Sequence, residues 1–512
     1  MERFLSRHAG RIAGSISGFD RMIFQGRLLW MTHTEGMGKF LSSQQVLLKD
    51  FGRYAESLSN QIKEHAQRLG EQSGRPLIYV NSWKQSKDEI IRNIIARDEI
   101  KEGLIAIISC VEGGRSFGIE KDRGGKQLRL VSQQRRCLHF YFYYCDRDFG
   151  LMHIRLQTWA PFAIQVYVNG REWLARQMTR RHLPYQKHDN CFTKIEQLEM
   201  AQELFNRLDQ YAWPATLNRW ASQVHPLMKR GAKPQLKHYY WTLSQGEYAT
   251  DILFQDSGSL KQIYPSLIRY ALDHFSCRDV LRFLGRRIHG LFEGEVRSHC
   301  GSRVEGRRIK HWVEENSIKM YDKAGCLLRI ETTINNPRRF KVRRKVTRQG
   351  RKVFTQVRLR KGVVDIRRRV ELCRQANARY LDALAVVGDT TPSHTVMDAV
   401  SRPVLRNGSR CRALRPICPV ESRWFQEILK PEHLLSGIRN SDLRKAIYAR
   451  MPAGTDPRTL AAAVTRRLQL FRAHGLIYKV PHTHCYRITK KGHIVMSTAL
   501  RFRITDVALL AA

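Results

Sequence analysis

Residues 316–335 read NSIKMYDKAGCLLRIETTIN, and this stretch decides the fold of the central part of the chain. Apolar and polar residues alternate on both sides of an Ala-Gly turn, a pattern that predicts a β-hairpin. If the turn holds an even number of residues, Asp322 and Glu331 share a face with Arg329 and lie four residues apart along it. At about 3.3 Å per residue that separation is roughly 13 Å, too far for one metal ion to bind both carboxylates. Glu331 therefore needs a partner carboxylate from another strand.

The stretch EYATDILF (247–254) offers such a partner. As a strand it places Glu247 and Asp251 on one face, although Ser244 and Glu247 also fit the capping box of a helix start. Carboxylate oxygens suit Mg²⁺ or Mn²⁺, so the hairpin and this stretch predict a divalent-metal site. The candidate ligands are Glu331, Asp251, Glu247 and Asp322. The alternative is that each carboxylate pairs with one of the many arginines.

The charge of the whole chain indicates its partner. Its 512 residues include 89 Lys and Arg against 46 Asp and Glu, a net charge of +43. Such an excess favours a polyanion, with DNA or RNA as the expected partner and an acidic membrane surface as the alternative. No apolar window is long enough for a transmembrane helix, and no secretory signal is found at the N-terminus. We therefore expect a cytoplasmic, nucleoid-associated protein, and leave open a homo-oligomer.

A second hairpin is extremely basic. Residues 340–362 read FKVRRKVTRQGRKVFTQVRLRKG, and residues 335–370 hold fifteen Lys or Arg against one acid, Asp365. The alternation predicts a ribbon whose charged face follows a phosphate backbone. The alternative is a solvated charged hairpin. The predicted DNA contacts are Arg338, Arg339, Lys341, Arg343, Arg344, Lys345, Arg358, Arg360 and Lys361.

Residues 421–512 give the clearest local pattern. Asp456 and Pro457 predict a helix start, and Gly475 predicts its end after His474. The hairpin LIYKV–CYRIT and a last helix follow. This order resembles a MarR-type winged helix over about 75 residues, which implies that the 457–474 helix enters the major groove. The DNA contacts implied by that resemblance are Arg458, Arg466, Arg467, His482 and His484. A winged helix that contacts protein is the alternative.

The opening hairpin carries a second resemblance. Its KMYDK and LRIE segments resemble rolling-circle replication initiators, the filamentous-phage gene-II type and related plasmid Rep proteins, over about 20 residues. The resemblance implies a nicking domain in which carboxylates hold a divalent metal and a tyrosine attacks a DNA phosphate. The positions that match are Lys319, Tyr321, Asp322, Lys323, Arg329 and Glu331. The nucleophile does not transfer by position. We take Tyr380, on the Arg-rich helix after the basic hairpin, as the candidate, with Tyr321, Lys319 and Lys323 as further catalytic candidates.

Together these patterns predict an α+β multidomain fold with an N-terminal α/β unit, a central Rep-like domain with the basic hairpin, and a C-terminal winged helix-turn-helix. A helix over 86–100 between strands at 75–81 and 104–111 predicts a β-α-β unit. No internal repeat is evident. The predicted divisions are 1–215, a linker at 216–238, 239–387, a linker at 388–420, and 421–512.

The first functional hypothesis is a site-specific DNA nicking or strand-transfer enzyme of a mobile element, either a replication initiator or a transposase. The second is a metal-dependent transposase or nuclease of the RNase-H type, with Asp20 as its first carboxylate. The third is a non-catalytic regulator that binds nucleic acid through the winged helix.

Overall fold

The computed structural model divides the chain into two compact units: Leu5–Pro265 with Arg297–Asn377, and Met1–Phe4 with Ser266–Val296 and Ala378–Ala512. It describes all residues except 82–84, 123–124, 126, 229–235, 237, 287–294, 304–305, 324, 349, 388–392, 407, 431–432, 434–436, 449–455, 482 and 506–512. The linker predicted at 216–238 lies inside the first of these units. The predicted boundary between an N-terminal unit and a central domain is therefore wrong.

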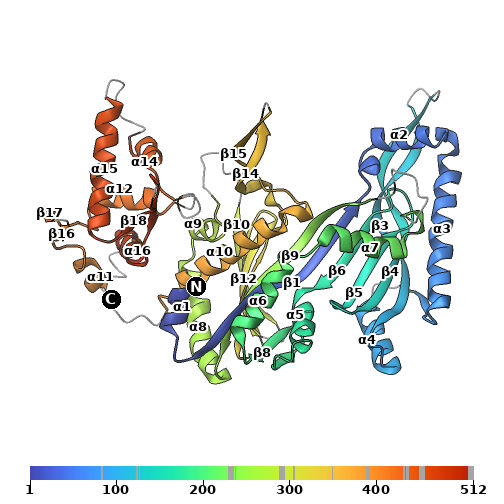
Figure 1. Ribbon diagram of the computed structural model, residues 1–512, viewed down its shortest axis with the longest axis horizontal. Coiled ribbons are helices and arrows are strands. Elements are labelled where there is room, and N and C mark those ends of the chain that lie inside the picture. Colours follow the sequence, from blue (N-terminus) through green and yellow to red (C-terminus); the bar gives the residue numbers. More distant parts are fainter. Residues whose placement is uncertain are drawn as a thin grey trace. The chain divides into compact units, whose positions relative to one another are not determined.

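A mixed sheet of eleven strands, drawn from residues 12–333, forms the centre of the fold (Figure 1). Its strand order is β10-β11-β12-β13-β9-β1-β6-β5-β4-β3-β2. The bounds are β1 (Ile12–Arg27), β2 (Leu77–Tyr79), β3 (Gly103–Lys121), β4 (Leu128–Asp146), β5 (Gly150–Gln157), β6 (Ile164–Asn169), β9 (Tyr240–Phe254), β10 (Val296–Arg303), β11 (Gly306–Val313), β12 (Asn316–Lys323) and β13 (Leu327–Thr333). The α+β class is confirmed, and so is the strand expected at 247–254.

The strand order repeats about the centre of the sheet. β1 and β9 pair antiparallel there, with β6-β5-β4-β3 beside β1 and β13-β12-β11-β10 beside β9. In each half a first strand leads through helices into a meander of four strands, and the last of these returns beside the first. The expectation that the chain has no internal repeat therefore fails at the level of topology.

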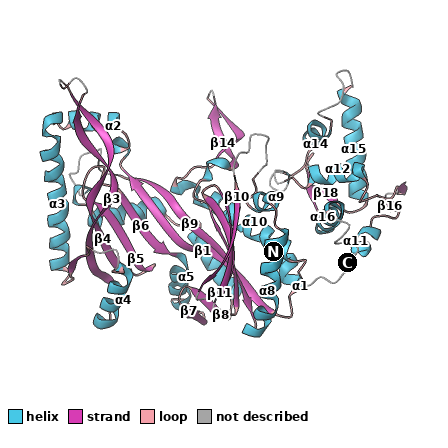
Figure 2. Ribbon diagram, turned by 180° about the vertical axis from the view of Figure 1, so that it is seen from behind, coloured by secondary structure: helices cyan, strands magenta, loops and turns pink. Residues whose placement is uncertain are grey.

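Helices cover the sheet in the first unit (Figure 2). The helices that lie wholly in this unit are α2 (Thr34–Ser43), α3 (Phe51–Gln72), α4 (Lys87–Asp98), α5 (Gly170–Thr179), α6 (Leu198–Leu208) and α7 (Trp213–Val224). Residues of both units form α1 (Glu2–Arg7), α8 (Ser257–His274) and α10 (Ile366–Leu384), and α9 (Cys277–Phe283) belongs to the second unit. The predicted β-α-β unit is confirmed: β2 and β3 pair parallel, and the Ser86 side chain caps α4 by accepting from the Glu89 amide. At Gly18 of β1 a Cβ would meet the Phe205 ring at 2.3 Å, so glycine allows α6 to pack directly on the sheet.

The opening hairpin forms as predicted, but in a different register. Lys323 pairs with Leu327, so three residues separate the strands where an even number was assumed. Gly325 has a φ of +73°, a conformation that favours glycine, and its amide donates to Asp322 Oδ1 at 3.1 Å. The shift by one residue turns Asp322 to the face opposite Glu331. Asp322 stabilises the turn.

The basic hairpin also forms as predicted. β14 (Lys341–Arg348) and β15 (Arg351–Arg358) pair antiparallel as a separate two-stranded sheet. Figure 2 shows β14 standing out from the large sheet.

The C-terminal part of the second unit has its own core. Its elements are α11 (Ser393–Asp398), β16 (Val404–Arg406), β17 (Ser409–Cys411), α12 (Pro419–Ile428), α14 (Asn440–Ile447), α15 (Pro457–Ala473), β18 (Ile477–Lys479), β19 (Tyr486–Ile488) and α16 (Lys490–Ile504). Asp456 caps α15 through the amides of Arg458 and Thr459, as predicted. Residues 388–420 are not merely a linker, because Val400 and Leu414 are buried in the same core as α15. None of the helices among the described residues has the length and apolar character to cross a membrane.

Candidate functional site

The predicted metal ligands come from neighbouring strands, but the register keeps them apart. Glu331 of β13 lies opposite Ala249 of β9, while Asp251 lies opposite Arg329. Glu247 lies opposite Thr333, two pairs along from Glu331 and Ala249. Glu331 and Asp251 therefore belong to different clusters of side chains on the same sheet face.

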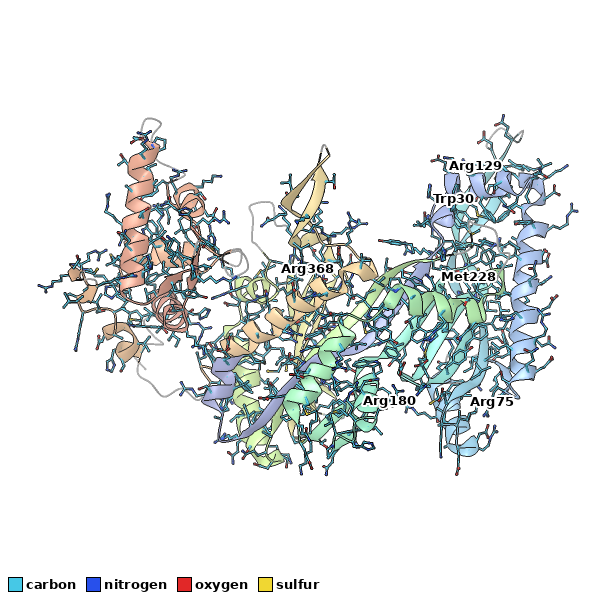
Figure 3. The ribbon with its side chains drawn as sticks, viewed as in Figure 1. Trp30, Arg75, Arg129, Arg180, Met228 and Arg368 are labelled. Atoms are coloured by element: carbon cyan, nitrogen blue, oxygen red, sulfur yellow. The ribbon has the colours of Figure 1, made fainter. Side chains whose placement is uncertain are left out.

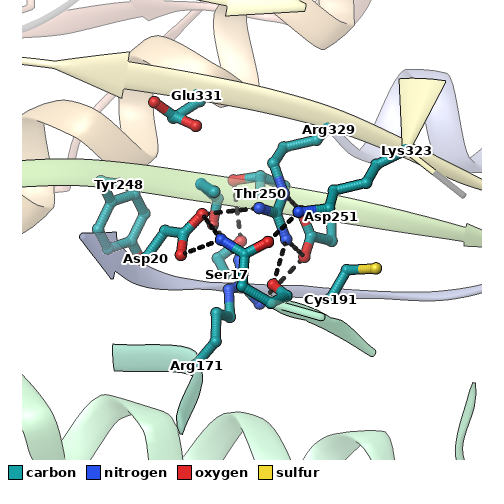
Figure 4. A network of polar contacts seen from close by, with 12 residues as sticks. Ser17, Asp20, Arg171, Cys191, Tyr248, Thr250, Asp251, Lys323, Arg329 and Glu331 are labelled. Atoms are coloured by element: carbon teal, nitrogen blue, oxygen red, sulfur yellow. Dashed lines mark hydrogen bonds and ion pairs between the residues drawn. The ribbon is translucent and has the colours of Figure 1, made fainter. Parts of the chain in front are cut away.

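Asp251 belongs to a buried ion network around Arg329 (Figure 4). Arg329 binds Asp251 with two nitrogens, Nε to Oδ1 at 2.6 Å and Nη2 to Oδ2 at 2.8 Å, and its Nη1 lies 2.7 Å from Asp20 Oδ2. Arg171 of α5 adds a second guanidinium, with Nη1 3.1 Å from Asp251 Oδ2. Burial alone would raise the pKa of Asp251, but the charges of Arg171 and Arg329 lower it below its usual value. Two carboxylates and two guanidinium groups thus balance one another inside the fold.

The turn between β7 (Tyr185–His188) and β8 (Cys191–Ile195) closes this network. The side-chain amide of Asn190 donates to both Asp20 oxygens, at 2.7 and 2.8 Å. The backbone carbonyl of Asn190 accepts from Arg329 Nη2 at 3.1 Å. Lys323 reaches the same turn, pairing with Asp189 at 3.2 Å and donating to the Asn190 side chain. The side chain of Lys323, a predicted catalytic residue, is therefore used in holding the β7–β8 turn.

Glu331 lies apart from this network in Figure 4 and has different partners. It is 1% exposed, and its Oε1 lies 2.6 Å from the Lys319 ammonium. Tyr321 donates its hydroxyl to Glu331 Oε2 at 3.0 Å. Burial raises the pKa of Glu331 although Lys319 opposes the shift, and burial also raises the pKa of Tyr321. A half-buried phenol, a buried carboxylate and an ammonium thus meet on β12 and β13.

The metal site predicted from these acids does not form as expected. Asp251 is occupied by guanidinium groups, and Asp322 by a turn amide. Glu247 accepts from the Gln245 side chain at 3.0 Å. Across the described ranges no group of three or more His, Cys, Asp or Glu side chains could hold a metal ion. Asp20, the first carboxylate of the RNase-H hypothesis, is committed to Arg329 and Asn190.

The predicted nucleophile Tyr380 is buried in the second unit. Its ring packs between Phe275 and Phe283, with centroids 5.1 Å away from each, and the residue has no exposed surface. A DNA phosphate cannot reach a hydroxyl in this position, so Tyr380 is wrong as the nucleophile. Of the two tyrosines predicted as catalytic, Tyr321 is the one that is half-buried and lies beside a carboxylate.

The basic hairpin presents one charged face, as its alternation predicts. Lys341 and Arg358 lie directly opposite each other, and both are exposed, as is Lys345. The other face carries half-buried valines, Val342 opposite Val357. Like charges in opposite positions repel, so the charged face lowers the stability of the hairpin when no anion is bound.

The other cations predicted near the hairpin divide into exposed and paired groups. Arg338 and Arg360 are exposed, and Lys361 is half-buried. Arg344 is paired with Asp365 at 2.7 Å, and Arg339 lies 3.6 Å from Glu314. The Arg343 side chain is outside the described part of the chain. Arg368 of α10, not predicted as a contact, is also exposed and pairs with Glu371 at 3.2 Å (Figure 3).

The cations predicted on the C-terminal module divide similarly. Arg458 and Arg466 on α15 are exposed, and so is His484 near the β18–β19 turn. Arg467 points inward instead, with Nη1 3.2 Å from Glu421 Oε1 and its guanidinium 5.6 Å from the Trp424 ring. Arg467, one of the predicted DNA contacts, is therefore held against α12 by Glu421 and Trp424. His482 is outside the described residues.

Sequence reasoning missed Arg171, Asp189 and Asn190. No motif distinguishes them, because the network joins Asp20 to a residue 309 positions away. The one available signal was that Arg329 lies between two apolar residues of a central strand, where an unpaired charge is excluded. Comparisons with protein families, with curated proteins and with solved structures give no match to this chain.

Proposed function

We propose that this protein binds duplex DNA through the β14–β15 hairpin and the C-terminal module. The observation that carries the proposal is the exposed charged face of the hairpin, where Lys341 lies opposite Arg358 with Lys345 nearby. Repulsion between these side chains is relieved when phosphates lie between them. A two-stranded ribbon also has the width of the major groove.

The C-terminal module supports the same function. The order α12, α14, α15, β18–β19 and α16 resembles that of a winged helix, in which the third helix enters the major groove and the hairpin contacts the backbone. Arg458 and Arg466 are exposed on α15, while Arg467 is held by Glu421. We therefore assign base contacts to Arg466, and Arg467 orients α15 against α12.

Selection of duplexes from a random library by the full chain tests this proposal. We expect an enriched motif, and a relaxed motif with Arg466→Ala, because one bidentate contact to a base contributes about 1–3 kcal/mol of discrimination. Arg53→Ala, which removes an exposed arginine from α3, is the matched control and should leave the motif unchanged. If no sequence is enriched above a basic carrier protein, sequence recognition is refuted.

One contact favours a second function, DNA strand nicking. The Tyr321 hydroxyl donates to Glu331, whose other oxygen lies beside Lys319, and this is the relation of a nucleophile, a base and an orienting group. Glu331 would take the phenol proton as the Tyr321 oxygen bonds to phosphorus. The bond from phosphorus to one DNA oxygen breaks, and that oxygen takes a proton from water to become a hydroxyl. A Mg²⁺ or Mn²⁺ ion supplied with the DNA would neutralise the charge of the phosphate.

Nicking is tested by incubating labelled single strands and duplexes with the full chain and either ion, followed by a denaturing gel. A covalent protein–DNA adduct that persists in Tyr380→Phe and vanishes in Tyr321→Phe supports Tyr321 as the nucleophile. Cleavage without an adduct, or an adduct that survives Tyr321→Phe, refutes the assignment. DNA binding by the hairpin does not depend on the result.

A further inference from the structure

A row of aromatic side chains crosses the N-terminal half of the sheet. Tyr141 of β4, His153 of β5 and Tyr167 of β6 come from three adjacent strands, and all three are half-buried. The ring centroids of Tyr141 and His153 are 5.6 Å apart, and those of His153 and Tyr167 are 5.1 Å apart. The row thus forms a continuous ladder on one face of the sheet.

The rings overlap only in part. The planes of His153 and Tyr167 differ by 6° at a centroid distance of 5.1 Å. Since stacked carbon atoms approach to about 3.5 Å, parallel rings at this distance are displaced sideways by roughly 3.7 Å. Tyr167 therefore keeps part of its face uncovered by the His153 ring, while Tyr143, opposite His153, packs on His153 with centroids 5.0 Å apart. Burial lowers the pKa of His153 to about 4, so this ring is uncharged at neutral pH and stacks as a neutral aromatic group.

Cations stand at both ends of the row. At one end the Arg21 guanidinium, exposed on β1, lies 5.7 Å from the Tyr167 centroid. At the other end the Lys87 ammonium lies 4.0 Å from the Tyr141 centroid, and the Arg155 guanidinium lies 5.8 Å from it. The spacing of rings between cations matches a strand that alternates bases and phosphates.

One acid fixes the geometry at the Tyr141 end. The Tyr141 hydroxyl donates to Glu112 at 2.9 and 3.0 Å, and the same carboxylate pairs with Lys87 at 2.6 Å and Arg155 at 2.8 Å. Burial would raise the pKa of Glu112, but the hydrogen bonds from Lys87 and Tyr141 lower it to about 2. The ring and both cations are thus held in place before any ligand arrives, which reduces the entropy lost on binding.

We propose that this row binds single-stranded nucleic acid, with bases stacked on Tyr141, His153 and Tyr167 and phosphates near Arg21, Lys87 and Arg155. Charge selects this occupant: the chain carries +43, and the three cations Arg21, Lys87 and Arg155 outnumber the nearby carboxylates Glu112 and Asp88. Stacking needs no particular base, so the row holds single strands without sequence preference. The proposal extends the proposed function from duplexes to single strands.

The test compares binding of a fluorescein-labelled oligothymidylate and of a blunt duplex of equal length to the full chain. Tyr167→Leu and His153→Leu should each weaken single-strand binding about 5- to 150-fold, the range for one lost base stack. Tyr167→Phe and His153→Phe keep a ring and should bind near wild type. Tyr79→Leu is the matched control, because Tyr79 is 57% exposed on β2 and outside the row. Equal loss in the leucine and phenylalanine variants, or no loss in either, overturns the proposal.

Photocrosslinking of the wild-type chain keeps the test valid if a leucine variant fails to fold. An oligothymidylate that carries iodouracil should crosslink to peptides of β4, β5 and β6. Crosslinks confined to β14–β15 or to α15 would overturn the proposal. Duplex binding, measured on the same variants, should stay within about 2-fold of wild type, because paired bases do not expose their faces. Duplex binding that is lost when the cations of the β14–β15 hairpin are replaced, but kept in the variants of this row, supports the proposed function whether or not the row binds single strands. The two proposals can therefore fail separately.

Discussion

The charge on the β14–β15 hairpin can be tested by removing three side chains from its exposed face. The variant Lys341→Gln, Lys345→Gln, Arg358→Gln keeps a polar side chain at each position without the charge and leaves the valine face intact. Arg344 is not changed, since its guanidinium is paired with Asp365 and its loss would leave a nearly buried carboxylate unpaired. The net charge falls from +43 to +40, that is, 43 − 3.

The expected effect follows from counterion release. Each lost phosphate contact reduces the slope of log K against log salt by about 0.9, so three contacts reduce it by about 2.7. Between about 50 and 200 mM salt the wild-type protein should therefore lose roughly 40-fold more affinity for a duplex than the variant does. Removing like charges that face one another should also make the free variant as stable as the wild type or more stable.

The assay is fluorescence anisotropy of a labelled duplex at several salt concentrations. A matched control removes three exposed cations from α3 in the same unit, by Arg53→Gln, Lys63→Gln and Arg68→Gln, and gives the same net charge. We expect the control to keep the wild-type slope. Equal slopes in both variants would show that only total charge matters, and an unchanged slope in the hairpin variant would exclude the hairpin from the interface.

Three further predictions concern individual side chains. Arg329→Met should lower the free energy of unfolding by about 3–5 kcal/mol, because it leaves two buried carboxylates short of a partner, and urea titration at neutral pH measures this; a loss below about 1 kcal/mol would mean that the network is dispensable. Burial raises the pKa of Glu331 above 4.5, so protonation of Glu331 favours the folded state. The free energy of unfolding of the wild type should therefore fall relative to that of Glu331→Gln as pH rises from about 4.5 through the raised pKa. Stability curves that stay parallel over this pH range would contradict the shift. Asp456→Ala should cost about 1 kcal/mol by removing the cap of α15, and Asp456→Asn should restore most of it, as thermal melts would report; an equal cost in both variants would point to the charge and not to the cap.

Local patterns in the sequence predict local structure well in this chain. The capping residues Ser86 and Asp456 mark the starts of α4 and α15, because a side-chain oxygen that satisfies helix amides acts within three residues. Alternation likewise predicts the strands at 316–335 and 340–362. The number of residues in a turn is less well determined by sequence, and a shift of one residue moved Asp322 to the opposite face from Glu331.

Pairing between distant segments explains the larger errors. The stretch 216–238 has the composition of a linker, yet β1 and β9 on either side of it pair along most of their length at the centre of the sheet. The composition of a segment indicates whether that segment is exposed to water. It carries no information on which strands the flanking segments pair with. The repeated strand order also has no counterpart in sequence similarity, because equivalent strands need matching apolar faces and not matching residues.

The carboxylates of the central sheet follow from the cationic composition of the chain. The chain has 89 Lys and Arg against 46 acids, and some of its arginines are buried. A buried guanidinium needs carboxylates or carbonyl oxygens beside it, and Arg369 is satisfied by the carbonyls of Leu243 and Lys361. Asp20 and Asp251 meet this need for Arg171 and Arg329, and their arrangement is set by the two cations. Spacing of acids is therefore a weak guide to metal binding in a strongly basic protein. Glu331 differs, because it faces the Tyr321 hydroxyl and the Lys319 ammonium and, among the described residues, no guanidinium group.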